Sequence, residues 1–160
     1  MRTHELVAAT VEETEAVGEA LGRAAEGREL IGLVGDLGAG KTSFVRGLAR
    51  GLGIDPDRVH SPSFTTMTEY PGGRLPLTHV DLYRLESPLA DELSLREALY
   101  GEGVAAVEWF DRIASGAGDE ALVVTLRHTA PESRAIRLEA RGSRHERLLD
   151  AVLGAKETCR

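Results

Sequence analysis

A glycine-rich loop with a single lysine is the first feature of this sequence that could do chemistry. Residues 35–42, Gly-Asp-Leu-Gly-Ala-Gly-Lys-Thr, match the pattern G-x-x-x-x-G-K-[ST] between a strand-like and a helix-like run. Glycines let backbone N–H groups approach phosphate oxygens, and the following helix N-terminus adds positive potential. Lys41 supplies a charge for the β- and γ-phosphates, and the Thr42 hydroxyl suits Mg²⁺. The pattern predicts a nucleotide site; the alternative is a glycine-rich turn that binds nothing.

Two acidic residues could complete such a site. Asp81 in "LTHVDLYRL" and Glu108 in "VAAVEWFD" each follow an apolar, strand-like run. A charge there is costly unless it is paired with a cation or hydrogen-bonded, or unless the strand simply ends in solvent. Phosphoryl-transfer sites need a further Mg²⁺ ligand and a group that orients the attacking water. Either acid could take either role.

Three further features bear on the ligand. The hydroxyl-rich segment Ser61–Tyr70 follows the predicted P-loop helix, as does the γ-phosphate sensor of nucleotide switches, although an ordinary strand explains it equally well. Trp109, the only tryptophan, suits a core position at least as well as a site. The sequence has no asparagine and no glutamine, which excludes the guanine-selecting Asn-Lys-x-Asp box and a Ras-like glutamine. We therefore expect an adenine nucleotide.

These residues have to be positioned by one α/β domain. A chain of 160 residues with 42% hydrophobic content suits one domain, 1–160, better than two. Strands alternate with helices, and Thr10 is a plausible N-cap of the first helix. We expect a P-loop NTPase-like fold, with a mixed, mainly parallel sheet flanked by helices and a C-terminal antiparallel strand pair. The expected strands are 4–10, 28–35, 75–85, 103–110, 121–130 and 133–142, and the expected helices are 11–27, 41–53 and 144–154.

Charge and composition limit the partners. The net charge of −7 and a pI near 5.3 argue against a broad basic surface, so any contact with RNA is expected to be indirect. Neither a signal-peptide segment nor an apolar run of about 20 residues is found, so we expect no membrane contact. Cys159 is the only cysteine and agrees with a reducing compartment. The expected location is the cytoplasm.

Several motifs taken together resemble the TsaE (YjeE) family, ATPases of bacterial tRNA threonylcarbamoyladenosine synthesis. The resemblance covers roughly the first two thirds of the chain in order. It departs at Phe110-Asp111, where family members often have proline or another small turn residue. The motifs are "TVEET" at 10–14, "VGEALG" at 17–22, the loop and helix at 35–53, "SPSFTTMTEY" at 61–70, "HVDLYRL" at 79–85 and "VEW" at 107–109.

The resemblance implies an ATP- and Mg²⁺-dependent enzyme that works with TsaB and TsaD. TsaD transfers the threonylcarbamoyl group to adenosine beside the anticodon, and ATP hydrolysis allows repeated cycles. By position, Thr42 and Glu108 would ligate Mg²⁺, Asp81 would support the metal or the water, and Thr10 and Arg134 would lie near the nucleoside. The phosphates would be held by Gly35, Asp36, Leu37, Gly38, Ala39, Gly40, Lys41, Thr42 and Ser43.

Two other functions remain open at this point. A nucleotide-dependent binding clamp without significant turnover would use the same loop, metal ligands and switch-like segment. A small-molecule kinase would need an acceptor pocket and a closing lid, and the sequence indicates neither. For the ATPase, slow turnover of the isolated protein is expected, because the site is completed by its partner.

Overall fold

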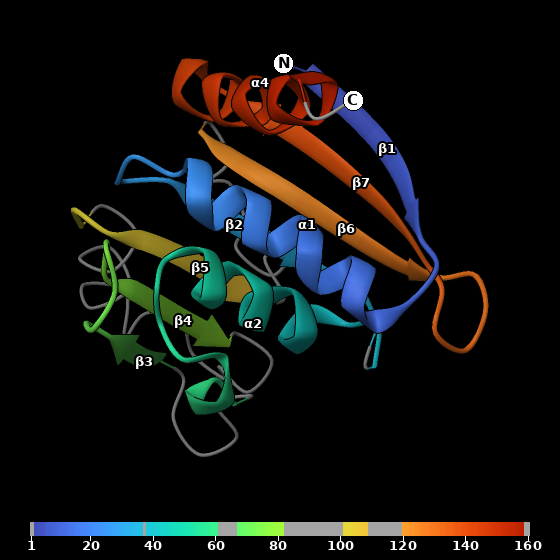
Figure 1. Ribbon diagram of the computed structural model, residues 1–160, viewed down its shortest axis with the longest axis horizontal. Helices are drawn as coiled ribbons and strands as arrows, with labels where there is room; N and C mark the ends of the chain where they lie inside the picture. The colour runs from blue at the N-terminus through green and yellow to red at the C-terminus, as the bar shows by residue number, and fades with distance from the viewer. Residues whose placement is uncertain (1, 37, 61–66, 82–100, 109–119, 159–160) are drawn as a thin grey trace, which may run out of the picture.

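The computed structural model describes residues 2–36, 38–60, 67–81, 101–108 and 120–158 (Figure 1). These residues form seven strands, three α-helices and one 3₁₀ turn, η1 (Pro56–Arg58). The helices are α1 (Val11–Ala24), α2 (Lys41–Gly51) and α4 (Ser143–Thr158). The strands are β1 (Arg2–Ala8), β2 (Leu30–Val34), β3 (Met67–Tyr70), β4 (Leu77–Asp81), β5 (Val104–Glu108), β6 (Ala121–His128) and β7 (Arg134–Arg141).

All seven strands belong to one mixed sheet in the order β1-β7-β6-β2-β5-β4-β3. The four central strands are parallel, because β2 pairs in parallel with both β5 and β6, and β4 pairs in parallel with β5. Antiparallel strands complete both edges: β3 beside β4, and the β6–β7 hairpin followed by β1. The predicted fold class is confirmed, including the C-terminal antiparallel pair.

The three helices lie on one face of the sheet, with α1 beside α2 and α4 along β7 (Figure 1). The main core fills the space between this helical layer and the sheet. Its side chains include Leu21 of α1, Phe44 of α2, Leu149 of α4 and Ile31 of β2. Strand β2 is apolar along its whole length because it lies at the centre of the sheet, with parallel neighbours on both sides.

A smaller apolar cluster lies on the opposite face of the sheet. Alternation along the strands separates it from the main core, since Ala105 and Val107 of β5 belong to this cluster and Ala106 belongs to the other.

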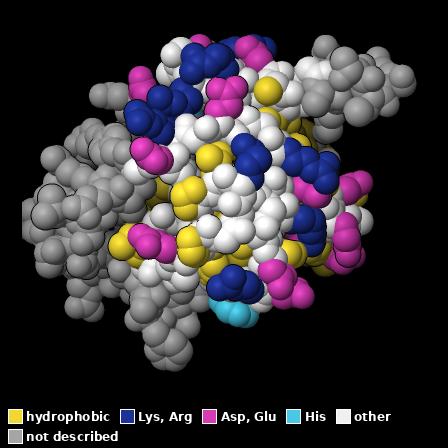
Figure 2. Space-filling view, turned by 60° about the vertical axis from the view of Figure 1, so that its left-hand side comes forward, with side chains coloured by type: hydrophobic (Ala, Val, Ile, Leu, Met, Phe, Trp, Pro, Cys, Tyr) yellow, Lys and Arg dark blue, Asp and Glu magenta, His cyan; other side chains and the backbone are white. Residues whose placement is uncertain are grey.

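On the face seen in Figure 2, acidic and basic side chains are interspersed over the described atoms. None of the helices in the described part of the chain combines the length with the apolar character that a membrane-spanning helix needs.

The first helix begins as the sequence predicts. The Thr10 hydroxyl accepts a hydrogen bond from the backbone N–H of Glu13 at 3.1 Å, and the Glu13 carboxylate accepts one from the N–H of Ala9. The bond to Thr10 satisfies one of the N–H donors that the first turn of a helix leaves open, and the bond from Ala9 holds the Glu13 side chain against the residue that precedes the N-cap. The N-cap role of Thr10 is confirmed, and it fixes the end of α1 that lies beside the glycine-rich loop.

Candidate functional site

The glycine-rich loop connects the end of β2 at Val34 to the start of α2 at Lys41. Gly38 and Gly40 have φ angles of 78° and 102°, in the left-handed region that residues with a Cβ rarely adopt. In the part of the chain that the structure describes, no side chain caps α2 at Gly40. The first N–H groups of a helix have no partner within the helix, so this end of α2 is suited to an anion.

Lys41 is folded back onto its own loop. Its side chain is buried, and Nζ donates hydrogen bonds to the carbonyl oxygens of Gly35 at 2.5 Å and Asp36 at 3.1 Å. These contacts hold the ammonium group against the loop instead of letting it extend into solvent. An ammonium group at this position would stabilise the negative charge of a phosphate bound to the loop.

Asp81 and Glu108 are the last residues of the neighbouring strands β4 and β5, so they lie together at the carboxyl ends of the parallel strands. They are register partners in the parallel pair β4–β5, and Glu108 is also the register partner of Leu33 near the end of β2. Both carboxylates therefore lie near the strand end from which the glycine-rich loop departs. Alternation places Glu108 on the same face as Ala106, whose side chain packs in the core under α2. The structure thus brings together three elements that lie far apart in the sequence.

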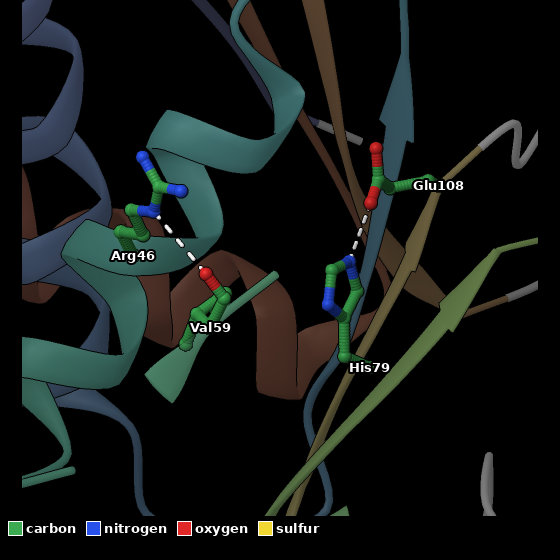
Figure 3. A network of polar contacts seen from close by, with 4 residues as sticks. All are labelled: Arg46, Val59, His79 and Glu108. Atoms are coloured by element: carbon green, nitrogen blue, oxygen red, sulfur yellow. Dashed lines mark hydrogen bonds and ion pairs between the residues drawn. The ribbon is translucent and has the colours of Figure 1, made fainter. Parts of the chain in front are cut away.

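His79 lies near the same strand ends; the sequence analysis included it in the "HVDLYRL" motif at 79–85 but gave it no role. Its Nε2 lies 2.5 Å from Oε2 of Glu108, and the exposed fractions of the two residues are 0% and 3% (Figure 3). A carboxylate only accepts hydrogen bonds, so Nε2 donates. One signal was available: His79 occupies an inward-facing position of an apolar strand, where a polar side chain needs a partner.

Arg134 lies at the start of β7, with 7% of its surface exposed, and its guanidinium reaches the glycine-rich loop. Nε donates to the carbonyl oxygen of Ala39 at 2.8 Å, and Nη2 lies 3.4 Å from that of Gly38. Nη1 donates to carbonyl oxygens of the β6–β7 turn, from Ala130, Pro131 and Ser133, at 3.2, 3.1 and 2.9 Å. The side chain therefore joins the hairpin to the loop.

The start of α1 lies on another side of the loop. Thr14 is buried, and its methyl carbon would lie 3.8 Å from a Cβ placed on Gly40. Thr10, one helical turn earlier, uses its hydroxyl as the N-cap of α1. A role of Thr10 and Arg134 toward a nucleoside stays a prediction.

The remaining predicted residues follow the loop into α2. Thr42 and Ser43 are half-buried in the first turn of the helix, Ala39 is buried, and Asp36 is exposed. Among the described residues, no three His, Cys, Asp or Glu side chains gather as a metal site of their own. Leu37, Trp109, Phe110-Asp111, the segment 61–66 and the later part of the "HVDLYRL" motif lie outside the described residues.

Comparison with known proteins agrees on one family. The family model of threonylcarbamoyl adenosine biosynthesis protein TsaE matches residues 8–136. The TsaE protein of Bacillus subtilis is 40% identical over 141 residues, which is 88% of each chain. The TsaE protein of Treponema pallidum is 41% identical over 132 residues, covering 81% of this chain and 96% of that protein.

The fold agrees as well. The crystal structure of YdiB from Bacillus subtilis superimposes with a TM-score of 0.83 at 34% sequence identity, covering 97% of both chains. The family match includes the glycine-rich loop, both strand-end acids and Arg134. The chain therefore belongs to the TsaE family of threonylcarbamoyl adenosine biosynthesis proteins.

Proposed function

We propose that this protein is a Mg²⁺-dependent ATPase that supports the threonylcarbamoyladenosine modification of tRNA. The observation that carries the proposal is the position of two strand-end carboxylates, Asp81 and Glu108, beside a glycine-rich loop whose lysine is held against it. In open α/β sheets, ligands bind outside the carboxyl ends of the parallel strands. Membership of the TsaE family supplies the tRNA-modification context.

The proposed reaction is attack of water on the γ-phosphate in line with the leaving ADP oxygen. Lys41 and the loop N–H groups stabilise the negative charge on the transferring phosphoryl group. One of the two carboxylates orients the attacking water. The other holds the metal, and the burial of Glu108 next to β2 favours Glu108 for that role.

The donor set suits Mg²⁺. Thr42 offers a hydroxyl, and Asp81 and Glu108 offer carboxylates, which are the hard oxygen ligands that Mg²⁺ prefers. Protein sites for Mg²⁺ commonly supply only one or two carboxylates and leave other positions to phosphates and water. When bound, the ion would neutralise charge on the β- and γ-phosphates. Thr42 and Glu108 are the proposed ligands, with Asp81 as a supporting group.

The proposed partners are TsaD and TsaB, with tRNA reached only through their complex. A net charge of −7 and the mixed charges in Figure 2 favour this indirect route over direct binding to a polyanion. Partners of this kind place the protein in the cytoplasm. Because a partner completes the site in this scheme, the isolated protein should hydrolyse ATP slowly.

The first experiment measures phosphate release from ATP by wild type, Lys41→Ala and Glu108→Ala, each alone and with TsaB and TsaD. We expect partners to stimulate the wild type, and both variants to lose that stimulation, because one loses the loop cation and the other a metal ligand. Lys156→Ala changes the only other lysine, which lies in α4, and is the matched control with wild-type turnover.

Three other outcomes would revise the proposal. Wild-type turnover by Lys41→Ala would reject the loop as the ATP site. Tight ATP binding with no turnover in any mixture would favour a nucleotide-dependent clamp. Loss of activity in Asp81→Ala but not in Glu108→Ala would exchange the roles of the two acids.

A further inference from the structure

We propose that His79 is a positioning residue that orients the Glu108 carboxylate for Mg²⁺. This inference rests on the proposed function and extends it to a side chain that touches neither nucleotide nor metal. The side chains meet between neighbouring strands, His79 from β4 and Glu108 from β5, with a distance of 2.5 Å between Nε2 and Oε2.

The direction of the carboxylate is the first argument. In Figure 3, one carboxylate oxygen of Glu108 faces the imidazole and the other points away from it. A single strong hydrogen bond to one oxygen removes the freedom of the carboxylate to turn about its last torsion, which is otherwise a broad one. The second oxygen is thereby presented in a fixed direction.

The burial of His79 is the second argument. Its side chain is fully buried, and its neighbours in β4 include the buried residues Leu77 and Val80. Among the described residues, Nδ1 of His79 is the one buried side-chain nitrogen or oxygen without a hydrogen-bond partner. Burying an imidazole with only one of its two nitrogens hydrogen-bonded costs free energy of folding. We therefore infer that the role of His79 is its hydrogen bond to Glu108.

The register of β4 against β5 explains how the His79 side chain reaches the Glu108 carboxylate. In the parallel pair, Asp81 is opposite Glu108 and His79 is opposite Ala106. His79 therefore lies two residues earlier on the same face, and the small side chain of Ala106 leaves space for the imidazole to reach forward to the carboxylate. Groups that hydrogen-bond a metal-ligating carboxylate orient it, and their loss typically weakens metal binding or activity about 10–100-fold.

The test measures metal affinity separately from turnover. Binding of Mn²⁺ as the probe is followed by electron paramagnetic resonance at saturating concentrations of a non-hydrolysable ATP analogue. We expect His79→Leu to weaken Mn²⁺ binding about 10–100-fold while leaving nucleotide affinity in EDTA unchanged. His79→Gln retains an N–H donor and should recover part of the loss, and it also serves as the test if the leucine variant does not fold.

A double-variant cycle and a stability control separate positioning from general damage. If His79 acts through Glu108, His79→Leu should have no further effect in a Glu108→Gln background. The control is His145→Leu, because His145 is another buried histidine, hydrogen-bonded to Leu30 at the opposite end of β2. This control should lower the melting temperature and leave Mn²⁺ affinity unchanged.

The inference and the proposed function can fail separately. If Glu108→Gln weakens Mn²⁺ binding but His79→Leu does not, the positioning role is wrong and the ATPase proposal stands. Equal effects of His79→Leu with and without the Glu108 carboxylate would also overturn it. If Lys41→Ala binds nucleotide as wild type does, the proposed function fails, and the positioning role fails with it.

Discussion

Arg134 illustrates how a single cation can shape a backbone site through its contacts with carbonyl oxygens. Its guanidinium donates to carbonyl oxygens of the glycine-rich loop and of the β6–β7 turn. A trans peptide unit directs its C=O and its N–H to opposite sides. Holding the Ala39 carbonyl toward Arg134 therefore turns the N–H of Gly40 away from it. Arg134 thus fixes the direction of a loop N–H through the other side of the same peptide.

Replacing Arg134 by lysine should separate this bridging geometry from charge. An ammonium cannot span both the loop and the turn as the planar guanidinium does, so hydrogen bonds to the buried carbonyl of Ala39 or to the half-buried carbonyl of Ser133 are lost. We expect Arg134→Lys to lower the free energy of unfolding by about 1–3 kcal/mol and to weaken nucleotide binding. Urea unfolding and titration with a fluorescent ATP analogue measure the two effects.

The matched control is Arg127→Lys on β6, whose side chain is exposed. It should change the free energy of unfolding by no more than about 0.5 kcal/mol. Arg134→Lys with wild-type stability and wild-type affinity would show that charge alone suffices at this position.

The parts of the candidate site that lie close together in the sequence could be recognised from the sequence. Residues 35–43 follow one another, so the loop was recognisable from its pattern, and the strand-end acids from the apolar runs before them. The bond between His79 and Glu108 was not recognisable, because the two residues are 29 positions apart and meet only through strand pairing. This hydrogen bond depends on the register of β4 against β5, and no local sequence pattern predicts that register.

At the scale of elements, α1 and α2 pack backbone against backbone. Each helix carries two glycines four residues apart, Gly18 and Gly22 in α1, and Gly47 and Gly51 in α2. A Cβ on any of them would overlap a backbone carbonyl oxygen of the other helix. This close approach brings the N-terminus of α1 beside the glycine-rich loop that precedes α2.

Gly47→Ala tests this contact. The added methyl group meets the carbonyl oxygen of Glu15, which is backbone and cannot turn aside, so the helices have to separate. We expect the free energy of unfolding to fall by about 3 kcal/mol, although alanine favours the isolated helix. Differential scanning calorimetry or urea unfolding gives the value.

Gly154→Ala in α4 is the matched control, since a Cβ there would meet no atom within 4 Å beyond its chain neighbours and the backbone of its own helix. It should stabilise the protein by about 0.5–1 kcal/mol through helix propensity alone. Destabilisation by both substitutions to a similar extent would contradict the account of the α1–α2 contact.

Most helices and strands could be predicted from the sequence, but the order of the strands in the sheet and the packing of the helices could not. The central strands and the helices were expected from periodicity. The N-terminal strand was expected at 4–10 and is found at Arg2–Ala8, because pairing with β7 determines its ends. The placement of β2 between β5 and β6 joins segments far apart in sequence, and local patterns carry no signal for that order. The α1–α2 glycine contact was missed for the same reason.

At the scale of the whole molecule, His145 joins the C-terminal helix to the centre of the sheet. The N–H of Leu30 donates to Nε2 of His145 at 3.0 Å, and Nδ1 lies 3.1 Å from the carbonyl oxygen of Arg141. Both bonds are made by the neutral imidazole with its hydrogen on Nδ1. Burial lowers the pKa of His145 below 6.5, and repulsion by Arg144 adds to this, against the raising effects of the Arg141 carbonyl and of the Glu29 and Glu120 carboxylates.

The sign of the resulting pH dependence follows from linkage. The unfolded chain binds a proton at this histidine near pH 6.5, while the folded chain binds it only at lower pH. As pH falls below about 6.5, the unfolded state takes up more protons, and the contribution of His145 to stability declines. The decline levels off once pH is below the pKa of the folded state.

Urea unfolding of wild type and His145→Leu between pH 7.5 and pH 5 isolates this contribution from those of the other histidines. At pH 7.5 we expect the variant to be less stable by about 1–3 kcal/mol, because the N–H of Leu30 loses its acceptor inside the core. Toward pH 5 the difference should shrink, since only the wild type has to protonate a buried imidazole or break its bond to Leu30. If the difference in free energy of unfolding stays constant over this range, proton binding at His145 is not linked to unfolding. If the difference grows on acidification, the folded protein favours the charged imidazole.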